Sequence, residues 1–176
     1  MTRVIRKSRT TSSREAAELL AGIFVAELVK PSKCLWIVSP WISDIPVLDN
    51  VGGEFDGLWE MPHRSLRLTE VLVALASSGT EVVIGSTTDS SNDAFLRRVE
   101  VAFESQGLAS QLTLSLDGAG ELHEKAITGD DFAVAGSMNI TNNGVFVREE
   151  FIEFRRDEEF VARARMDAFE RFGGVL

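Results

Sequence analysis

The sequence contains a single cysteine, Cys34, and only two histidines in 176 residues. One cysteine excludes an internal disulfide and any metal site built from several cysteines, and it is typical of a reducing compartment. The apolar runs are too short to span a bilayer, and the basic start lacks the apolar core of a secretory signal. We therefore expect a cytoplasmic protein with no membrane partner, and we expect Cys34, inside the run CLWIVS, to be a buried, inert thiol.

Positive charge is also in short supply, with a formal net charge of −9. This balance counts against a surface that grips nucleic acid or anionic lipid by bulk electrostatics. The charge is uneven, however, and five of the 18 basic residues lie within the first 14 positions. We expect residues 1–11 to form a basic, flexible arm, and a solvated terminus is favoured there over an arm that grips phosphate. The basic residues concerned are Arg3, Arg6, Lys7, Arg9 and Arg14.

Length and hydrophobic periodicity predict one globular domain over residues 1–176. Helical and strand patterns alternate through the first two thirds of the chain, which indicates an α/β sandwich with a mixed, largely parallel central sheet flanked by helices. A hairpin over residues 121–137, a strand over 149–155 and a helix over 157–172 are expected to follow. The earlier expected elements are helices at 12–30, 65–79 and 91–107, strands at 33–41, 80–85 and 112–116, and a loop at 44–63.

Polar residues gather at the two ends of the expected hairpin. His123 and Lys125 are two residues apart, so in a strand their side chains would project to the same face. Ser137 and Asn139 are spaced in the same way, directly after Gly136, which tolerates unusual backbone conformations. An imidazole, an ammonium, a hydroxyl and an amide brought together in this way suit a phosphate group. Each piece alone is more often structural, but their joint occurrence on one hairpin favours a reaction centre.

The stretch HEKAITGDDFAVAGSMN resembles the signature of the phospholipase D superfamily: His-x-Lys, four residues, Asp, and then Gly-Ser-x-Asn. The segments CLWIVSPWIS, VALASSGTEVVIGS and REEFIEF resemble other parts of that family's domain. The resemblance implies a phospholipase D-like α/β sandwich. It also implies chemistry that needs no metal and no other cofactor, because lysines and asparagines balance the phosphate charge.

The resemblance implies a role for each motif residue. His123 would form a covalent phosphohistidine, Lys125 and Asn139 would bind phosphate oxygens beside Ser137, and Glu149 would orient the histidine. Asp130, with Gly136, would support the motif without touching substrate. The gap from Asp130 to Gly136 is one residue shorter than the usual pattern, so Asp131 competes with Asp130. Only one of the adjacent Glu149 and Glu150 can serve, and Glu149 is favoured.

The family mechanism uses two such motifs, whereas this chain has one, and His63 lacks a matching lysine or Gly-Ser-x-Asn. The prediction is therefore a homodimer whose two His123 residues face one phosphate across a two-fold axis. Short single-motif members are commonly nucleases, so we expect a metal-independent phosphodiesterase acting on nucleic acid, with DNA favoured. The segment IVSPWIS resembles bacterial members of the family that belong to restriction or DNA-modification systems. One such system is a gene cluster that inserts 7-deazaguanine bases into DNA, which would supply partner proteins. A catalytically quiet DNA- or protein-binding dimer is the alternative, and a phospholipid hydrolase is disfavoured.

Overall fold

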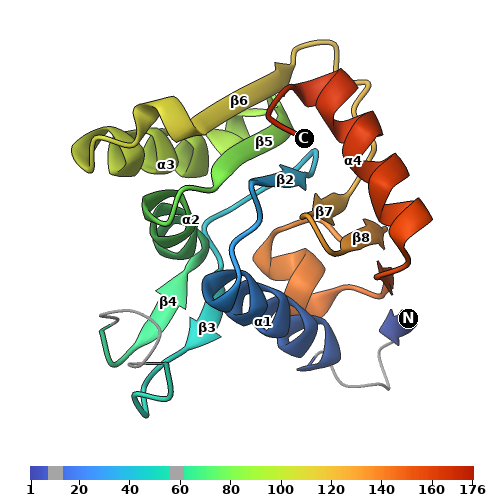
Figure 1. The fold of residues 1–176 in the computed structure, drawn as a ribbon, viewed down its shortest axis with the longest axis horizontal. Coiled ribbons are helices and arrows are strands. Elements are labelled where there is room, and N and C mark those ends of the chain that lie inside the picture. Colours follow the sequence, from blue (N-terminus) through green and yellow to red (C-terminus); the bar gives the residue numbers. More distant parts are fainter. Residues whose placement is uncertain (8–13, 56–61) are drawn as a thin grey trace.

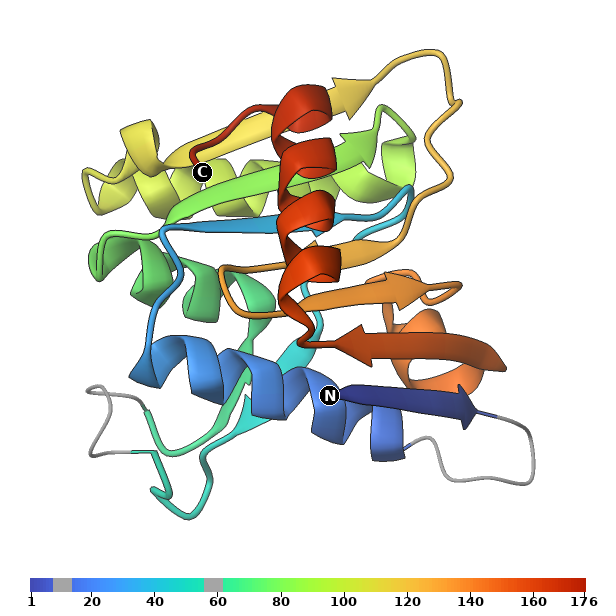
Figure 2. The same cartoon turned by 45° about the vertical axis from the view of Figure 1, so that its right-hand side comes forward.

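The computed structural model describes residues 1–7, 14–55 and 62–176. Helices α1 (Arg14–Val29), α2 (Leu68–Ser77) and α3 (Asp93–Ser105) cover one face of a central sheet, and α4 (Glu158–Phe172) crosses the other (Figures 1 and 2). The strands of this sheet lie in the order β1 (Thr2–Lys7), β9 (Glu150–Arg155), β8 (Ala133–Gly136), β7 (Ala126–Thr128), β2 (Cys34–Val38), β5 (Glu81–Thr87) and β6 (Leu112–Asp117).

The expected α/β fold with a mixed sheet flanked by helices is confirmed, but the sheet is less parallel than expected. Only the pairs β2–β5 and β5–β6 are parallel, and the other four neighbouring pairs are antiparallel. The turn over residues 129–132 between β7 and β8 explains part of the difference. A turn this short can join only antiparallel strands, because a parallel pair needs a crossover connection.

Strand β2 forms the middle of the core, and all five of its residues are buried. Because side chains alternate along a strand, Leu35 and Ile37 pack into the large cluster under α1 and α2, while Cys34 and Trp36 face α4 and contact Ala168 of that helix. The indole Nε1 of Trp36 donates to the carbonyl of Gly173 at 2.8 Å, which fastens the end of α4 to the sheet. The expected burial of Cys34 is confirmed.

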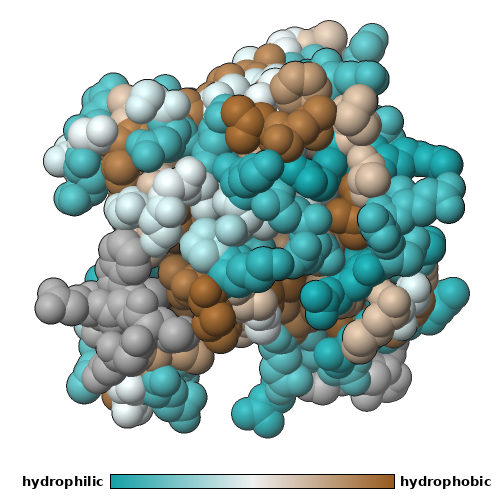
Figure 3. Space-filling model, viewed as in Figure 1, coloured by the Kyte–Doolittle hydropathy of each residue, from teal (hydrophilic) through white to brown (hydrophobic). Residues whose placement is uncertain are grey.

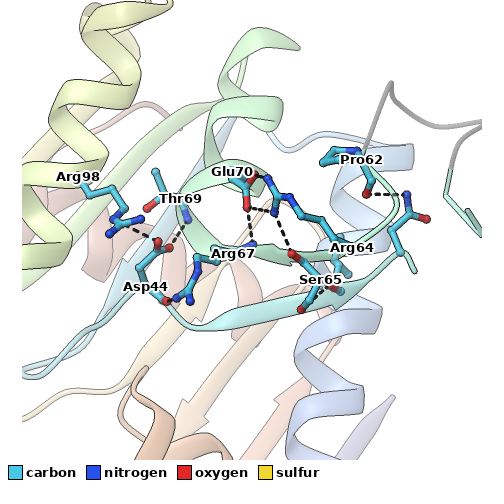
Figure 4. Close-up of polar contacts among 10 residues, drawn as sticks. Asp44, Pro62, Arg64, Ser65, Arg67, Thr69, Glu70 and Arg98 are labelled. Atoms are coloured by element: carbon cyan, nitrogen blue, oxygen red, sulfur yellow. Dashed lines mark hydrogen bonds and ion pairs between the residues drawn. The ribbon is translucent and has the colours of Figure 1, made fainter. Parts of the chain in front are cut away.

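A separate hairpin of β3 (Pro46–Asp49) and β4 (Ser65–Arg67) occupies sequence that was expected to be loop and helix. Helix α2 therefore begins at Leu68, three residues later than expected, since residues 65–67 pair as a strand. The carboxylate of Asp44 caps the helix by accepting from Thr69 N at 2.9 Å, and its carbonyl accepts from Arg67 at 2.6 Å (Figure 4). These bonds tie the segment after β2 to the start of α2.

The expectation of a free arm is wrong for residues 2–7, and residues 8–11 lie outside the described residues. Strand β1 pairs antiparallel with β9, with Lys7 opposite Glu150 and Ile5 opposite Ile152. Ile5 is only 2% exposed. Burial of this side chain against the sheet explains why the start of the chain folds back onto it.

Hydrophilic residues predominate on the face of the molecule seen in Figure 3, and the hydrophobic areas there are small and separate. Among the described residues, no helix combines the length and the apolar character needed to cross a membrane.

Candidate active site

One edge of the sheet collects the ends of the strands that carry the predicted site residues. Strands β2 and β8 end there and β7 and β9 begin there, as the pairs Val38–Ala126, Ala126–Ala135 and Gly136–Ile152 require. This is the right-hand edge of the sheet in Figure 2. The hairpin thus brings the segment carrying His123 and Lys125 to the segment that follows Gly136, and Gly136 N donates to the Lys125 carbonyl at 3.3 Å.

His123 and Lys125 precede the hairpin strand instead of lying within it. Strand β7 begins only at Ala126, so the expected strand start at residue 121 is wrong. The two residues are joined by a hydrogen bond, in which the ammonium of Lys125 donates to the main-chain carbonyl of His123 at 2.5 Å. The imidazole is exposed to solvent and the lysine is partly buried. The exposed histidine is open to a substrate, and the lysine charge lies beside it.

Hydrogen bonds to one carboxylate and one ion pair hold the segment that carries His123. The carboxylate of Asp117, the last residue of β6, accepts from Ala119 N at 2.8 Å and from Leu122 N at 2.7 Å. These hydrogen bonds lower the pKa of Asp117, so it is ionised at neutral pH. Arg171 near the end of α4 forms an ion pair with Glu124. His123 therefore lies between two anchored neighbours.

Ser137 and Glu150 form a hydrogen-bonded pair at this edge. The Ser137 hydroxyl donates to a carboxylate oxygen of Glu150 and accepts from Phe151 N at 2.9 Å. Glu150 is only 8% exposed, whereas Glu149 is exposed. Glu150 is therefore the glutamate that contacts Ser137 at this edge.

Close main-chain approach explains the glycine before Ser137. A Cβ added to Gly136 would lie 2.0 Å from the carbonyl oxygen of Phe151. Any side chain at this position would separate β8 from β9. Gly136 therefore allows the contact that brings Ser137 to Glu150.

Asn139 is held by the segment that follows β2. Its Oδ1 lies 3.3 Å from the hydroxyl of Ser39, and that hydroxyl accepts from Ile140 N at 3.1 Å. Ile140 also forms a bridge with Ile42. The NH₂ group of the Asn139 amide is the part that can donate to a phosphate oxygen.

Asp130 lies in the turn of the hairpin, at the opposite end from His123. Its carboxylate accepts from Lys33 N at 3.0 Å and pairs with Arg165 of α4 at 2.9 Å. Asp131 pairs with Lys30 at the end of α1. Asp130 thus joins the hairpin to β2 and α4, as a supporting residue would.

Sequence reasoning missed Ser39, Asn92 and Asp117, which hold the neighbouring segments in place. Asn92 is fully buried, accepts from Ile42 N at 2.9 Å and donates to the carbonyls of Pro40 and Thr87. Ser39 at the end of an apolar run was the only one with a signal in the sequence, since a strand leading to the site edge was expected there. The part of the chain that the structure describes contains no group of three or more His, Cys, Asp or Glu side chains arranged to hold a metal ion.

No family model and no curated protein matches the sequence. Solved structures do match, and they show that the chain has the fold of the phospholipase D family. One of them is the phospholipase D family member Nuc of Salmonella typhimurium, with 13% identity and a TM-score of 0.59 over 99% of this chain and 97% of that chain. NucT of Helicobacter pylori gives 13% identity and a TM-score of 0.60 over 99% of this chain and all of that chain. Phosphatidylserine synthase of Haemophilus influenzae gives 16% and 0.62, but this chain covers only 40% of it.

Proposed function

We propose that this protein is a phosphodiesterase that cleaves nucleic acid, with DNA as its substrate, through a phosphohistidine on His123. The observation that carries the proposal is the placement of Lys125, Ser137 and Glu150 at the sheet edge where exposed His123 lies. Lys125 and Asn139 would bind the non-bridging oxygens of the phosphate, where their donors stabilise negative charge in the transition state. These interactions would stabilise the transition state without a metal ion.

The reaction would proceed in two displacements. An imidazole nitrogen of His123 attacks phosphorus, the P–O bond to the leaving group breaks, and a protonated second histidine gives its proton to the departing oxygen. Water then attacks the phosphohistidine, the second histidine takes back a proton, and the P–N bond breaks. Glu150, through Ser137, would fix the hydroxyl beside the phosphate, so it replaces Glu149 in the proposal.

The second histidine would come from another copy of the chain. His63 belongs to the segment before β4, outside the seven-stranded sheet, and is not close in sequence to a lysine or to Gly-Ser-x-Asn. We therefore propose a homodimer through the motif edge, with one site built from both His123 side chains.

The net charge of −9 supports a second candidate, a DNA- or protein-binding dimer that does not cleave. For the cleaving form we propose a place in a bacterial DNA-modification or restriction system, on the resemblance of IVSPWIS to such members. A cytoplasmic location stays a prediction from the single cysteine.

A direct test incubates the purified protein with plasmid, single-stranded DNA and phosphatidylcholine vesicles in EDTA, beside His123→Ala and the matched control His63→Ala. We expect EDTA-resistant DNA cleavage that only the His123 variant loses. Glu150→Gln should lower the rate roughly 10- to 100-fold, as expected for loss of a charged hydrogen bond, and Glu149→Gln should not. Equal background cleavage by all the proteins would refute the nuclease proposal and favour the binding dimer that does not cleave. Cleavage of the vesicles alone would show that the substrate is a phospholipid and not DNA.

Subunit mixing tests the shared site. If both histidines are needed at one site, an equimolar, fully exchanged mixture with His123→Ala keeps about one quarter of the activity of the same total amount of wild type. Independent sites would keep about one half. A monomeric mass at micromolar concentration would also refute the shared site.

A further inference from the structure

The loop that leaves β2 at the site edge carries an exposed tryptophan. Trp41 is 43% exposed, although its neighbours Pro40 and Ile42 are both buried. Trp36, five residues earlier, is fully buried. A large aromatic side chain left in solvent between two buried residues needs an explanation that core packing does not give.

Both the main chain and the ring of Trp41 are fixed in place. The Ser39 hydroxyl donates to the Trp41 carbonyl at 2.7 Å, and the buried side chain of Asn92 bonds the residues on either side. The indole Nε1 lies 3.3 Å from a carboxylate oxygen of Asp89, to which it donates. Because these contacts already order the residue, a ligand that stacks on the ring would lose little binding free energy to further ordering.

The main chain of Trp41 is linked through one side chain to a residue proposed to bind phosphate. Ser39, which holds the Trp41 carbonyl, also contacts the amide of Asn139 at 3.3 Å. Strands β2 and β7 pair Val38 with Ala126, so Trp41 and His123 each lie three residues beyond the same pair, at the same end of the sheet.

We propose that the face of Trp41 stacks on the nucleobase next to the scissile phosphate, and that the substrate at this site is a single-stranded segment of nucleic acid. This inference rests on the proposed function. Stacking on a side chain requires an unpaired base, because the bases of a duplex are already stacked on one another. The Asp89 carboxylate at the indole edge repels a phosphate, so this side of the site suits a base and not the backbone. Hydrogen bonds from Ser91 lower the pKa of Asp89, which keeps it charged at neutral pH.

The test compares a single-stranded oligonucleotide with one that carries an abasic analogue beside each cleavable phosphate. Trp41→Ala should lower kcat/KM on the base-containing strand roughly 5- to 150-fold, and the penalty should fall below about twofold on the abasic strand. Trp41→Phe, which keeps an aromatic face, should recover most of the loss. Val101→Ala, which truncates another exposed apolar side chain on α3, is the matched control.

The inference would be overturned if Trp41→Ala lost the same factor in kcat/KM on both strands, or lost none on either. It would also be overturned if wild type cleaved only fully paired DNA. Failure of the proposed function gives a different result, since wild type then cleaves neither strand. In that case titration of His123→Ala with single-stranded oligonucleotide, followed by fluorescence anisotropy, decides. Trp41→Ala in the same background should weaken binding of the base-containing strand by the same factor, and unchanged binding would overturn the inference.

Discussion

Substitution of Asn92 by alanine should release two loops at the candidate site at once. The side chain is completely buried. Its Oδ1 accepts from Ile42 N at 2.9 Å, and its Nδ2 donates to Pro40 O at 2.9 Å and to Thr87 O at 3.1 Å. One asparagine thereby joins the segment after β2 to the end of β5.

The expected loss of stability follows from these contacts. Two lost hydrogen bonds to carbonyls cost about 1 kcal/mol each, and the Ile42 N–H left without its partner costs about 1–3 kcal/mol more. Pro40 O is the less severe loss, because the Thr87 hydroxyl also donates to it at 2.8 Å. Asn92→Ala should therefore lower the free energy of unfolding by about 3–5 kcal/mol, a large share of the 5–15 kcal/mol that is typical of a domain.

Urea unfolding followed by circular dichroism measures this loss, and the exposed Asn142→Ala serves as the control, with an expected change within about 0.5 kcal/mol. Asn92→Asp should also destabilise, because a carboxylate would face two carbonyl oxygens. DNA cleavage by the folded fraction of Asn92→Ala should fall as well, since Ile42 bridges to Ile140, the neighbour of Asn139. A loss below 1 kcal/mol would refute the reasoning that this side chain holds both loops.

Three other substitutions or probes test different parts of the structure. A Cβ on Gly144 would lie 2.2 Å from the carbonyl oxygen of Asn139, so Gly144→Ala should lower DNA cleavage at least about tenfold. Gly22→Ala in α1 is the control, because a Cβ there would meet no atom outside its own helix within 4 Å. Equal cleavage rates for the two variants would contradict this prediction. Burial raises the pKa of the Cys34 thiol to about 12, so a thiol reagent should modify it only after unfolding, and fast labelling of native protein would show that the core opens. Burial raises the pKa of Glu27 from its ordinary value of 4.5, so the folded state holds the proton more tightly and wild type loses stability as pH rises through that pKa. The free energy of unfolding of Glu27→Gln, measured in urea titrations relative to wild type, should therefore be more favourable near pH 7 than near pH 4. A difference between the two proteins that does not change with pH would argue against this reasoning.

Much of the architecture could be predicted because its signals are local. The apolar spacing of residues 158–172, the glycine at the end of the second helix and the run CLWIV each specify an element from neighbouring residues alone. The order and spacing of His123, Lys125, Ser137 and Asn139 likewise indicated a phosphate site before any coordinates. These inferences need only the chain and its two periodicities.

Other features depend on pairing between distant segments, which a single sequence does not specify. The sequence favoured Glu149 over Glu150, and a shift of one residue in a strand exchanges the two faces. The contact between Glu150 and Ser137 depends on the pairing of β9 with β8. From the sequence alone, residues 2–7 were predicted to be part of a basic arm. They form a strand because β9, far away in the sequence, lies beside them.

By itself, the sequence determined the polar groups that we propose to bind phosphate, their order and the hairpin that joins them. The tertiary structure alone decided that Ser39 and Asn92 hold Asn139 and Trp41 in place, over separations of 100 residues between Ser39 and Asn139 and 50 between Ile42 and Asn92. The physical reason is that a buried hydrogen bond needs both partners in one place, and only the packed sheet brings these segments together.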